Sequence, residues 1–320
     1  MTVAESNAHM KASPTNAVFH HILVATDFSK PSRRALYDAL VLASESDAQL
    51  SVVHVLPTDF KYAALENPPE IDLEQIATEK EINALMDEFG PVQKIDATLV
   101  RHGPVSEQVV AVIEERGIDL LVIGTRGRGG LQKLALGSVA EELLRVAPCP
   151  VMTIGPKADI ATATNGPGFH RILFATDFGK GSAKALPLAL ALAQAQRAKL
   201  IMLHMMSPMP ATSASLSAYA PAGAAADEVH EWEDSSRSRC LKQLRDCLPE
   251  KTGLEQDVEF VVGMEFFSEA VLTASAKFKV DLIVMGANRT ASVKAATHLP
   301  WSAVHEVVRY APCPVLTVAA

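Results

Sequence analysis

The sequence is poor in aromatic residues and contains no hydrophobic run of membrane-spanning length. Phe, Tyr and Trp make up 5% of the 320 residues, whereas hydrophobic residues as a whole make up 48%. A core built from this composition must consist mainly of Ala, Val, Leu and Ile. The most apolar stretch, at 185–193, is too short to cross a bilayer, because a spanning helix takes about 20 apolar residues. We therefore expect a globular protein without a membrane segment.

A targeting signal and an excess of positive charge are also missing. Residues 1–17 lack the apolar core of a signal peptide, so we expect them to be a disordered tail and the protein to be cytoplasmic. The net charge of −8 at pH 7 argues against a general nucleic-acid binder, which is usually basic. A small nucleotide is not excluded, since its binding needs only local positive potential.

The four cysteines do not form a metal-binding pattern. Cys149 and Cys313 occur in the same APCPV context, and Cys240 and Cys247 lie in a segment with helical character. Neither pair has the spacing of zinc ligands. We therefore expect four small buried or half-buried thiols and no metal site.

What the sequence does contain is an internal repeat. Three segments of the first half return in the second half in the same order: HHILVATDFSKPSRRAL at 20–36 as HRILFATDFGKGSAKAL at 170–186, DLLVIG at 119–124 as DLIVMG at 281–286, and APCPVMTI at 147–154 as APCPVLTV at 311–318. Such self-similarity indicates two copies of one structural unit.

The repeat predicts two domains, at 18–155 and 169–320, joined by a linker at 156–168. The second copy is the longer one. Its additional residues are expected in the segment 207–226, which is rich in Ala, Ser and Pro and has the composition of a surface loop.

Each copy alternates apolar segments of strand length with segments of helical periodicity. In the first copy the expected strands are 22–26, 50–56, 96–101, 119–124 and 150–154, and the expected helices are 30–46, 70–89, 105–117 and 138–147. This alternation is typical of a parallel sheet covered by helices on both faces. The expected fold class is therefore α/β, with two tandem doubly wound open sheets of five mainly parallel strands each. Ligands of such sheets bind beyond the carboxyl ends of the strands.

One loop at these ends, GTRGRGGLQKLALGS at 124–138, has the composition of a phosphate site. Gly124 ends the fourth strand, and Gly137 precedes a helix that begins at Ser138. The first amide groups of a helix lack internal partners and attract anions. Positive charge nearby comes from Arg126, Arg128 and Lys133.

A structural explanation of the same loop stays open. Ser138 and Glu141 fit the S-x-x-E capping box, in which the serine caps its own helix, and the glycines would then only form a turn. The Walker sequence and the dinucleotide fingerprint are both absent. The glycines alone therefore do not identify a phosphate site.

Several motifs together resemble the universal stress protein family. The pattern G-x2-G-x9-G-S that starts at residue 124 is similar to the nucleotide-binding signature of that family. It occurs with an opening ILVATDFS, a His-Val pair in the second strand, DLLVIG or DLIVMG in the fourth strand, and a closing PCPV. The resemblance covers about 18–155 and again 169–320. It implies a tandem member with the adenine-nucleotide-alpha-hydrolase-like fold.

The resemblance also implies a ligand, which is ATP with or without Mg²⁺. In ATP-binding members the acidic residue after the first strand lies near the adenine; here this is Asp27, flanked by Ala25 and Thr26. A main-chain contact to the base comes from the end of the second strand, here Val55. The ribose and phosphates contact the signature residues, here Gly124, Gly127, Gly137 and Ser138, and neighbouring pocket positions are Ile123, Arg126 and Val139.

The second copy departs from the signature in GANRTASVKAATHLPWS, residues 286–302. Arg289 takes the place of the second glycine, and Trp301, or Leu299 if no gap is placed, takes that of the third. We therefore expect the second copy not to bind ATP through this loop. Asp177 persists there, so the aspartate alone does not indicate binding; its other role is to accept hydrogen bonds from backbone amides at a turn.

Bulky and titratable residues elsewhere have simpler interpretations. Trp301, Pro300 and the Phe266–Phe267 pair either contact a partner protein or fill the vacated site of the second copy. His54 and His204, each inside an apolar strand, are expected to be hydrogen-bonded core groups. No chemistry is assigned to the histidines at the strand edges, His20, His21 and His170.

Three functions follow from these observations. The first is a stress-response regulatory protein that binds ATP in its first copy, with the second copy as a structural or partner-binding half. The second is a slow ATP hydrolase or an autophosphorylating protein, with Ser138 or Thr125 as the acceptor. The third is an interaction module that binds no nucleotide. Because no nucleophile–base pair stands out, we expect a binding protein and not an enzyme.

The expected partners are an adenine nucleotide and an unidentified protein, and neither nucleic acid nor a membrane. Family members commonly dimerise through their last strands. The resemblance therefore implies that PVMTI at 150–154 and PVLTV at 314–318 pair antiparallel within one chain, as a pseudo-dimer. Whether two chains form a further homodimer stays open.

Overall fold

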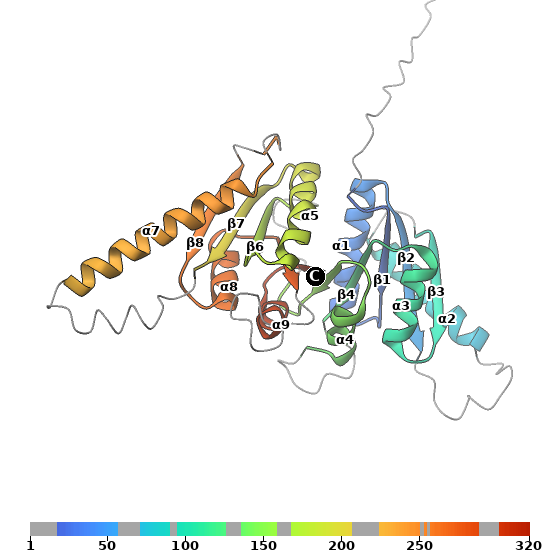
Figure 1. Ribbon diagram of the computed structural model, residues 1–320. Helices are drawn as coiled ribbons and strands as arrows, with labels where there is room; N and C mark the ends of the chain where they lie inside the picture. Colours follow the sequence, from blue (N-terminus) through green and yellow to red (C-terminus); the bar gives the residue numbers. More distant parts are fainter. Residues whose placement is uncertain are drawn as a thin grey trace, which may run out of the picture.

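The computed structural model describes residues 18–56, 71–89, 95–125, 136–158, 168–206, 224–249, 253–254, 257–287 and 301–320. Within these ranges the chain forms two similar α/β halves that share one sheet (Figure 1). No helix in the described ranges is long and apolar enough to cross a membrane.

The first half alternates strands and helices as the sequence predicts. Its elements are β1 His21–Ala25, α1 Lys30–Ser46, β2 Gln49–Leu56, α2 Ile71–Phe89, β3 Ala97–His102, α3 Val105–Arg116, β4 Leu120–Gly124, α4 Ser138–Val146 and β5 Val151–Ile154. The predicted bounds of these elements are confirmed to within a residue or so at each end.

The second half repeats the order of the first. Its elements are β6 Arg171–Thr176, α5 Lys180–Gln196, β7 Lys199–Met205, α7 Ala224–Asp246, β8 Val258–Gly263, α8 Phe267–Lys277, β9 Leu282–Ala287, α9 Trp301–Tyr310 and β10 Val315–Ala319. The predicted loop at 207–226 is wrong at its end, because residues 224–226 already belong to α7. The rest of that loop lies outside the described residues.

All ten strands form one sheet in the order β3-β2-β1-β4-β5-β10-β9-β6-β7-β8. Pairing is parallel within each half and antiparallel between β5 and β10, where Thr153 lies opposite Val315. The antiparallel junction confirms the pairing that the resemblance implied. The expectation of two separate sheets is wrong in number, because each half would otherwise expose an unpaired edge strand.

Each face of the sheet has its own apolar core. Helices α1, α2, α5 and α7 contribute to one core, and α3, α4, α8 and α9 contribute to the other. All four cysteines are free; Cys149 and Cys313 are buried, and Cys240 and Cys247 are half-buried, as predicted.

The connections place one edge of the first half at a topological switch. From β1 the chain proceeds to β2 and β3 on one side, whereas β4 and β5 lie on the other side of β1. The carboxyl ends of β1 and β4 therefore diverge into helices on opposite faces, which is where ligands of such sheets bind. Helix α1 begins beside this point, because Ser29 accepts a hydrogen bond from the Ser32 amide (3.4 Å) and Pro31 stands in the first turn.

Candidate functional site

The turn from β1 into α1 brings Thr26 and Asp27 to the carboxyl edge of the sheet. The Asp27 carboxylate accepts a hydrogen bond from the Ser29 amide (3.1 Å). Buried Thr26 accepts one from the Phe28 amide through its hydroxyl (3.1 Å). Phe28 has φ 62°, a left-handed conformation that is unusual for a bulky residue. Side-chain bonds on both sides of Phe28 thus hold a strained turn in place.

The same turn is bonded to β2. The Thr26 amide donates to the Val53 carbonyl (3.0 Å), and the His54 Nδ1 atom lies 2.7 Å from the Thr26 carbonyl oxygen. The next residue, Val55, is 8% exposed. The resemblance assigns Thr26, Asp27 and Val55 to the base. The bonds between the turn and β2 bring these three residues together at the carboxyl ends of β1 and β2. His54 is the hydrogen-bonded histidine that the sequence predicts.

Gly124 at the end of β4 has a packing reason of its own. A Cβ atom there would lie 2.7 Å from the Ser32 nitrogen and 2.9 Å from the Pro31 carbonyl carbon. Gly286, its counterpart in β9, would meet the Gly181 carbonyl carbon at 2.1 Å and the Ser182 nitrogen at 2.3 Å. A glycine stands at this position in both halves because the first turn of a helix packs closely against it. The helix is α1 in the first half and α5 in the second.

The two ends of the glycine-rich loop meet. The Thr125 amide donates to the Ile154 carbonyl (2.9 Å), and the Gly137 amide donates to the Thr125 carbonyl (2.9 Å). Ile123, just before, is 3% exposed and belongs to the core. Arg126 and Gly127 lie outside the described residues. Within the described chain the buried Thr125 hydroxyl has no hydrogen-bond partner.

Gly137 differs from Gly124 in that its backbone angles do not require a glycine. It is the N-cap of α4 with φ −66° and ψ 142°, an extended conformation open to any residue. Its place in the signature therefore calls for a reason other than backbone conformation.

The start of α4 contradicts the capping-box explanation. Ser138 is the first helical residue and is exposed, and the Glu141 amide bonds to the Gly137 carbonyl (2.9 Å), not to the Ser138 hydroxyl. The Glu141 carboxylate instead pairs with Arg145 (3.1 Å) and with His305 of the second half (3.6 Å). Val139 is 37% exposed. The first turn of α4 thus presents a hydroxyl that its own helix does not use.

In the second half the equivalent aspartate is engaged by the protein. Asp177 Oδ1 accepts hydrogen bonds from the Gly179 amide (2.8 Å) and from the Ser182 hydroxyl (2.6 Å). In the first half Ser32, at the place of Ser182, donates its hydroxyl to the Ser29 carbonyl (3.0 Å). The turn role considered for Asp177 is therefore confirmed.

The second half also repeats the histidine contact. His204 Nδ1 lies 2.9 Å from the Thr176 carbonyl oxygen. Burial lowers the pKa of His204, although the Thr176 bond and the Asp177 charge act in the opposite direction. The loop at 288–300, with Arg289, lies outside the described residues; Trp301 begins α9.

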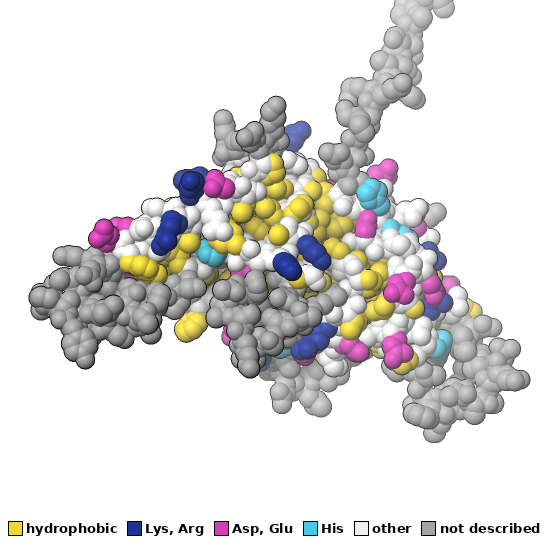
Figure 2. Space-filling view, in the orientation of Figure 1, with side chains coloured by type: hydrophobic (Ala, Val, Ile, Leu, Met, Phe, Trp, Pro, Cys, Tyr) yellow, Lys and Arg dark blue, Asp and Glu magenta, His cyan; other side chains and the backbone are white. Residues whose placement is uncertain are grey.

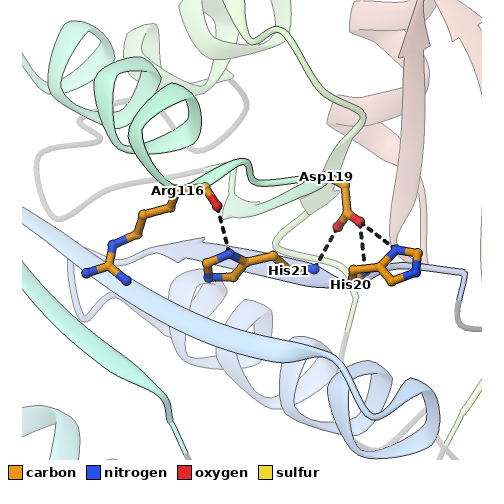
Figure 3. Close-up of polar contacts among 4 residues, drawn as sticks. All are labelled: His20, His21, Arg116 and Asp119. Atoms are coloured by element: carbon orange, nitrogen blue, oxygen red, sulfur yellow. Dashed lines mark hydrogen bonds and ion pairs between the residues drawn. The ribbon is translucent and has the colours of Figure 1, made fainter.

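The opposite edge of the sheet carries a structural cluster (Figure 3). Asp119 accepts the amides of His20 (2.7 Å) and His21 (3.0 Å) and contacts the His20 ring (3.3 Å), while His21 Nδ1 lies 3.0 Å from the Arg116 carbonyl. Asp281 accepts the equivalent two amides in the second half. These contacts fix the start of each half's first strand. The described residues contain no group of three or more His, Cys, Asp or Glu that could hold a metal ion.

Two residues of the site escaped the sequence analysis. His54 was predicted as a core group without a role in the site, and Thr125 only as a phosphate acceptor in one alternative. The signal for His54 was its recurrence as His204 at the same place of the repeat. Nothing in the sequence shows that the Thr125 hydroxyl is buried.

The chain is similar to known proteins along both halves. The sequence model of the Universal stress protein family matches residues 19–155 and 168–319. A universal stress protein A homolog of Coxiella burnetii is 34% identical over 142 residues, which are 43% of this chain and 98% of that protein. The universal stress protein YxiE of Bacillus subtilis is 30% identical over 147 residues, 43% of this chain and 99% of that protein.

Solved structures of other proteins are similar to nearly the whole chain. An example is a universal stress protein from Archaeoglobus fulgidus, with a TM-score of 0.60 and 19% identity, covering 94% of this chain and 96% of that one. At this identity the likeness shows the shared fold.

Proposed function

Since this chain belongs to the universal stress protein family, with one family domain in each half, we propose that it is a regulatory protein that binds ATP in its first half. The observation that carries the proposal is Gly137. It stands where the family signature has its third glycine, and its φ and ψ would suit any residue. A glycine that the backbone does not need is explained by a ligand that approaches the main chain closely.

The residues around Gly137 fit a nucleotide. Asp27 and Val55 would hold the adenine, the first by its carboxylate and the second through its main chain. The amino end of α4, with the exposed Ser138 hydroxyl, would hold phosphate oxygens, because helix amino ends attract anions. The turn at Thr26 and the end of β4 bring these groups to one edge.

The second half is proposed to bind no ATP and to act as a structural or partner-binding half. Its loop sequence has Arg289 in place of the second glycine of the signature, and Trp301 or Leu299 in place of the third. Directly after β8 of the second half, Met264 is 41% exposed and Phe266 is 83% exposed. An exposed apolar pair of this kind is suited to contact another protein.

Binding without rapid catalysis fits the site best. Thr125 is 1% exposed, so its hydroxyl cannot receive a phosphoryl group without local opening. Ser138 is the exposed hydroxyl at the loop, and autophosphorylation there is the alternative function. Incubation with ATP labelled in the γ-phosphate, compared with a Ser138→Ala variant, separates the two: transfer to Ser138 supports the alternative, and an intact nucleotide supports the regulatory function.

Thermal unfolding with and without Mg-ATP tests the binding. A ligand at 100 times its Kd stabilises the folded state by about 2.7 kcal/mol, so the unfolding temperature should rise. Gly137→Trp, which brings an indole to the place expected to hold phosphate, should abolish the rise. Val146→Trp is the matched control, since Val146 lies on the same helix and is 48% exposed. If the wild-type protein shows no shift at millimolar ATP, the proposal is wrong; repetition with EDTA tells whether Mg²⁺ takes part.

A further inference from the structure

His54 is the residue that connects the two parts of the proposed base-binding edge. Both main-chain polar groups of Thr26 bond to consecutive residues of β2: its amide to the Val53 carbonyl (3.0 Å) and its carbonyl to His54 Nδ1 (2.7 Å). Thr26 directly precedes Asp27, and His54 directly precedes Val55. The two bonds therefore hold the backbone just before Asp27 against the backbone just before Val55.

The chemistry of this contact is determined by its acceptor. A carbonyl oxygen can only accept, so Nδ1 of His54 carries the hydrogen. The imidazole is half-buried and packs against the Phe28 ring, with ring centroids 4.9 Å apart and planes inclined by 46°. Phe28 is the residue in the left-handed conformation. Ring packing and hydrogen bond together limit the imidazole to one orientation.

We infer that His54 is a positioning residue of the nucleotide site: its Nδ1–H holds the Thr26 carbonyl and thereby sets Asp27 and Val55 for the base. The inference rests on the proposed binding of ATP in the first half. It goes beyond that proposal because it assigns a contribution to ligand affinity to His54. This residue is the sequence neighbour of Val55 and is bonded to Thr26, the sequence neighbour of Asp27.

The second half supplies a matched control inside the same molecule. His204 makes the same bond to the Thr176 carbonyl (2.9 Å), and its ring lies 4.2 Å from that of Phe178. Phe178 is also left-handed, with φ 57°. The two histidines therefore contribute alike to folding. If His54 were only a structural group, changing either histidine would have the same small consequence for ATP.

The test uses three variants of the full chain, with ATP affinity measured by calorimetry and stability by urea unfolding. His54→Phe keeps a ring against Phe28 but removes the donor, and should weaken ATP binding on the order of tenfold, the upper end for one neutral hydrogen bond. His54→Asn keeps an N–H close to the Nδ1 place and should stay within about threefold of the wild type. His204→Phe should lower stability as His54→Phe does, with unchanged affinity.

The outcomes are separable from those of the proposed function. If the wild-type protein binds no ATP, the proposed function fails. If it binds ATP and His54→Phe keeps the wild-type affinity, the positioning role is wrong. It is equally wrong if His204→Phe weakens binding as much as His54→Phe, or if His54→Asn is as weak as His54→Phe. Should His54→Phe not fold, the comparison of His54→Asn with a His54→Gln variant, whose amide reaches toward the Nε2 place, decides the question in the same way.

Discussion

At the residue scale, two glycines of one signature have different physical reasons. Gly124 is required by packing, because a Cβ there would lie 2.7 Å from a backbone nitrogen of α1. Gly137 has ordinary backbone angles at the N-cap of α4. The comparison of the two halves gives the same division, since the counterpart of the first glycine persists as Gly286 and that of the third does not. Of the two, Gly137 is therefore the one on which the proposed nucleotide site depends.

Gly124→Ala should destabilise the protein whether or not ATP is present. The added methyl group must displace the backbone of Pro31 and Ser32, and overpacking of this kind costs about 1–3 kcal/mol. Gly286→Ala should cost at least as much, because its closest backbone contact would be at 2.1 Å. Urea unfolding without nucleotide measures both. A Gly124→Ala protein with wild-type stability that has lost only ATP binding would show that the ligand, not packing, selects this glycine.

At the scale of one element, α1 carries a buried ion pair that α5 lacks. Arg34 Nε donates to Asp38 Oδ1 at 2.7 Å, with side chains 9% and 7% exposed. Arg34 Nη1 and Asp38 Oδ2 have no hydrogen-bond partner in the described part of the chain. The repeat places Lys184 and Leu188 at the equivalent positions of α5. Burial raises the pKa of Asp38 from 3.8 to about 6, although the Arg34 charge and hydrogen bond lower it.

The stability of the protein should therefore depend on pH through Asp38. A raised pKa means that the folded protein binds the proton more tightly than the unfolded chain does. The contribution of Asp38 to the free energy of unfolding thus falls as the pH rises from about 4 to about 6. The cost of burying the ionised carboxylate is fully present above about pH 6. The free energy of unfolding of the wild type should therefore rise relative to that of Asp38→Asn as the pH falls through this window, by up to about 1.4 kcal/mol per pH unit.

Urea unfolding of both proteins at a series of pH values gives this difference, and the remaining carboxylates cancel in it. Stability curves that run parallel for wild type and Asp38→Asn between pH 4 and pH 6 would contradict the burial effect, since they would mean that Asp38 has the same pKa in both states.

At the scale of the whole molecule, the two halves close on each other through complementary residues. Besides the β5–β10 pairing, Thr153 and Thr317 donate their hydroxyls across the junction to the Val315 and Val151 carbonyls, each at 3.1 Å. His305 follows Ser302 by the same interval as Glu141 follows Ser138, so the Glu141–His305 pair joins equivalent positions. Two first halves paired in this manner would set Glu141 against a second Glu141.

His305→Glu should weaken the docking of the halves by repulsion from Glu141. The two side chains are 29% and 37% exposed, so the effect is that of a surface pair, about 0.2–1 kcal/mol of unfolding free energy. In a Glu141→Gln background the same substitution should cost almost nothing. A double-mutant cycle by urea unfolding measures this coupling energy. A cost that is equal in both backgrounds would show that the pair does not connect the halves.

The space-filling view shows hydrophobic side chains across the middle of this face, where the two halves meet, with a few Lys and Arg side chains beside them and further charged side chains toward both ends (Figure 2). The antiparallel pairing of β5 with β10 covers the last strand of each half at this junction. The intramolecular junction therefore takes the edge through which the resemblance implies dimerisation, and further association of two chains would need another surface.

The sequence by itself determined the elements of this fold and their repetition, because apolar periodicity and strand-length runs depend on local order along the chain. It also pointed to the loop at 124–138 through a signature that survives in one copy and is lost in the other. The tertiary structure decided the rest. Whether Gly124 packs against α1, whether Ser138 caps α4 and which carbonyl His54 holds are contacts between segments distant in sequence, and so is the junction that makes ten strands one sheet. Such contacts depend on distances in space, which the order of residues does not contain.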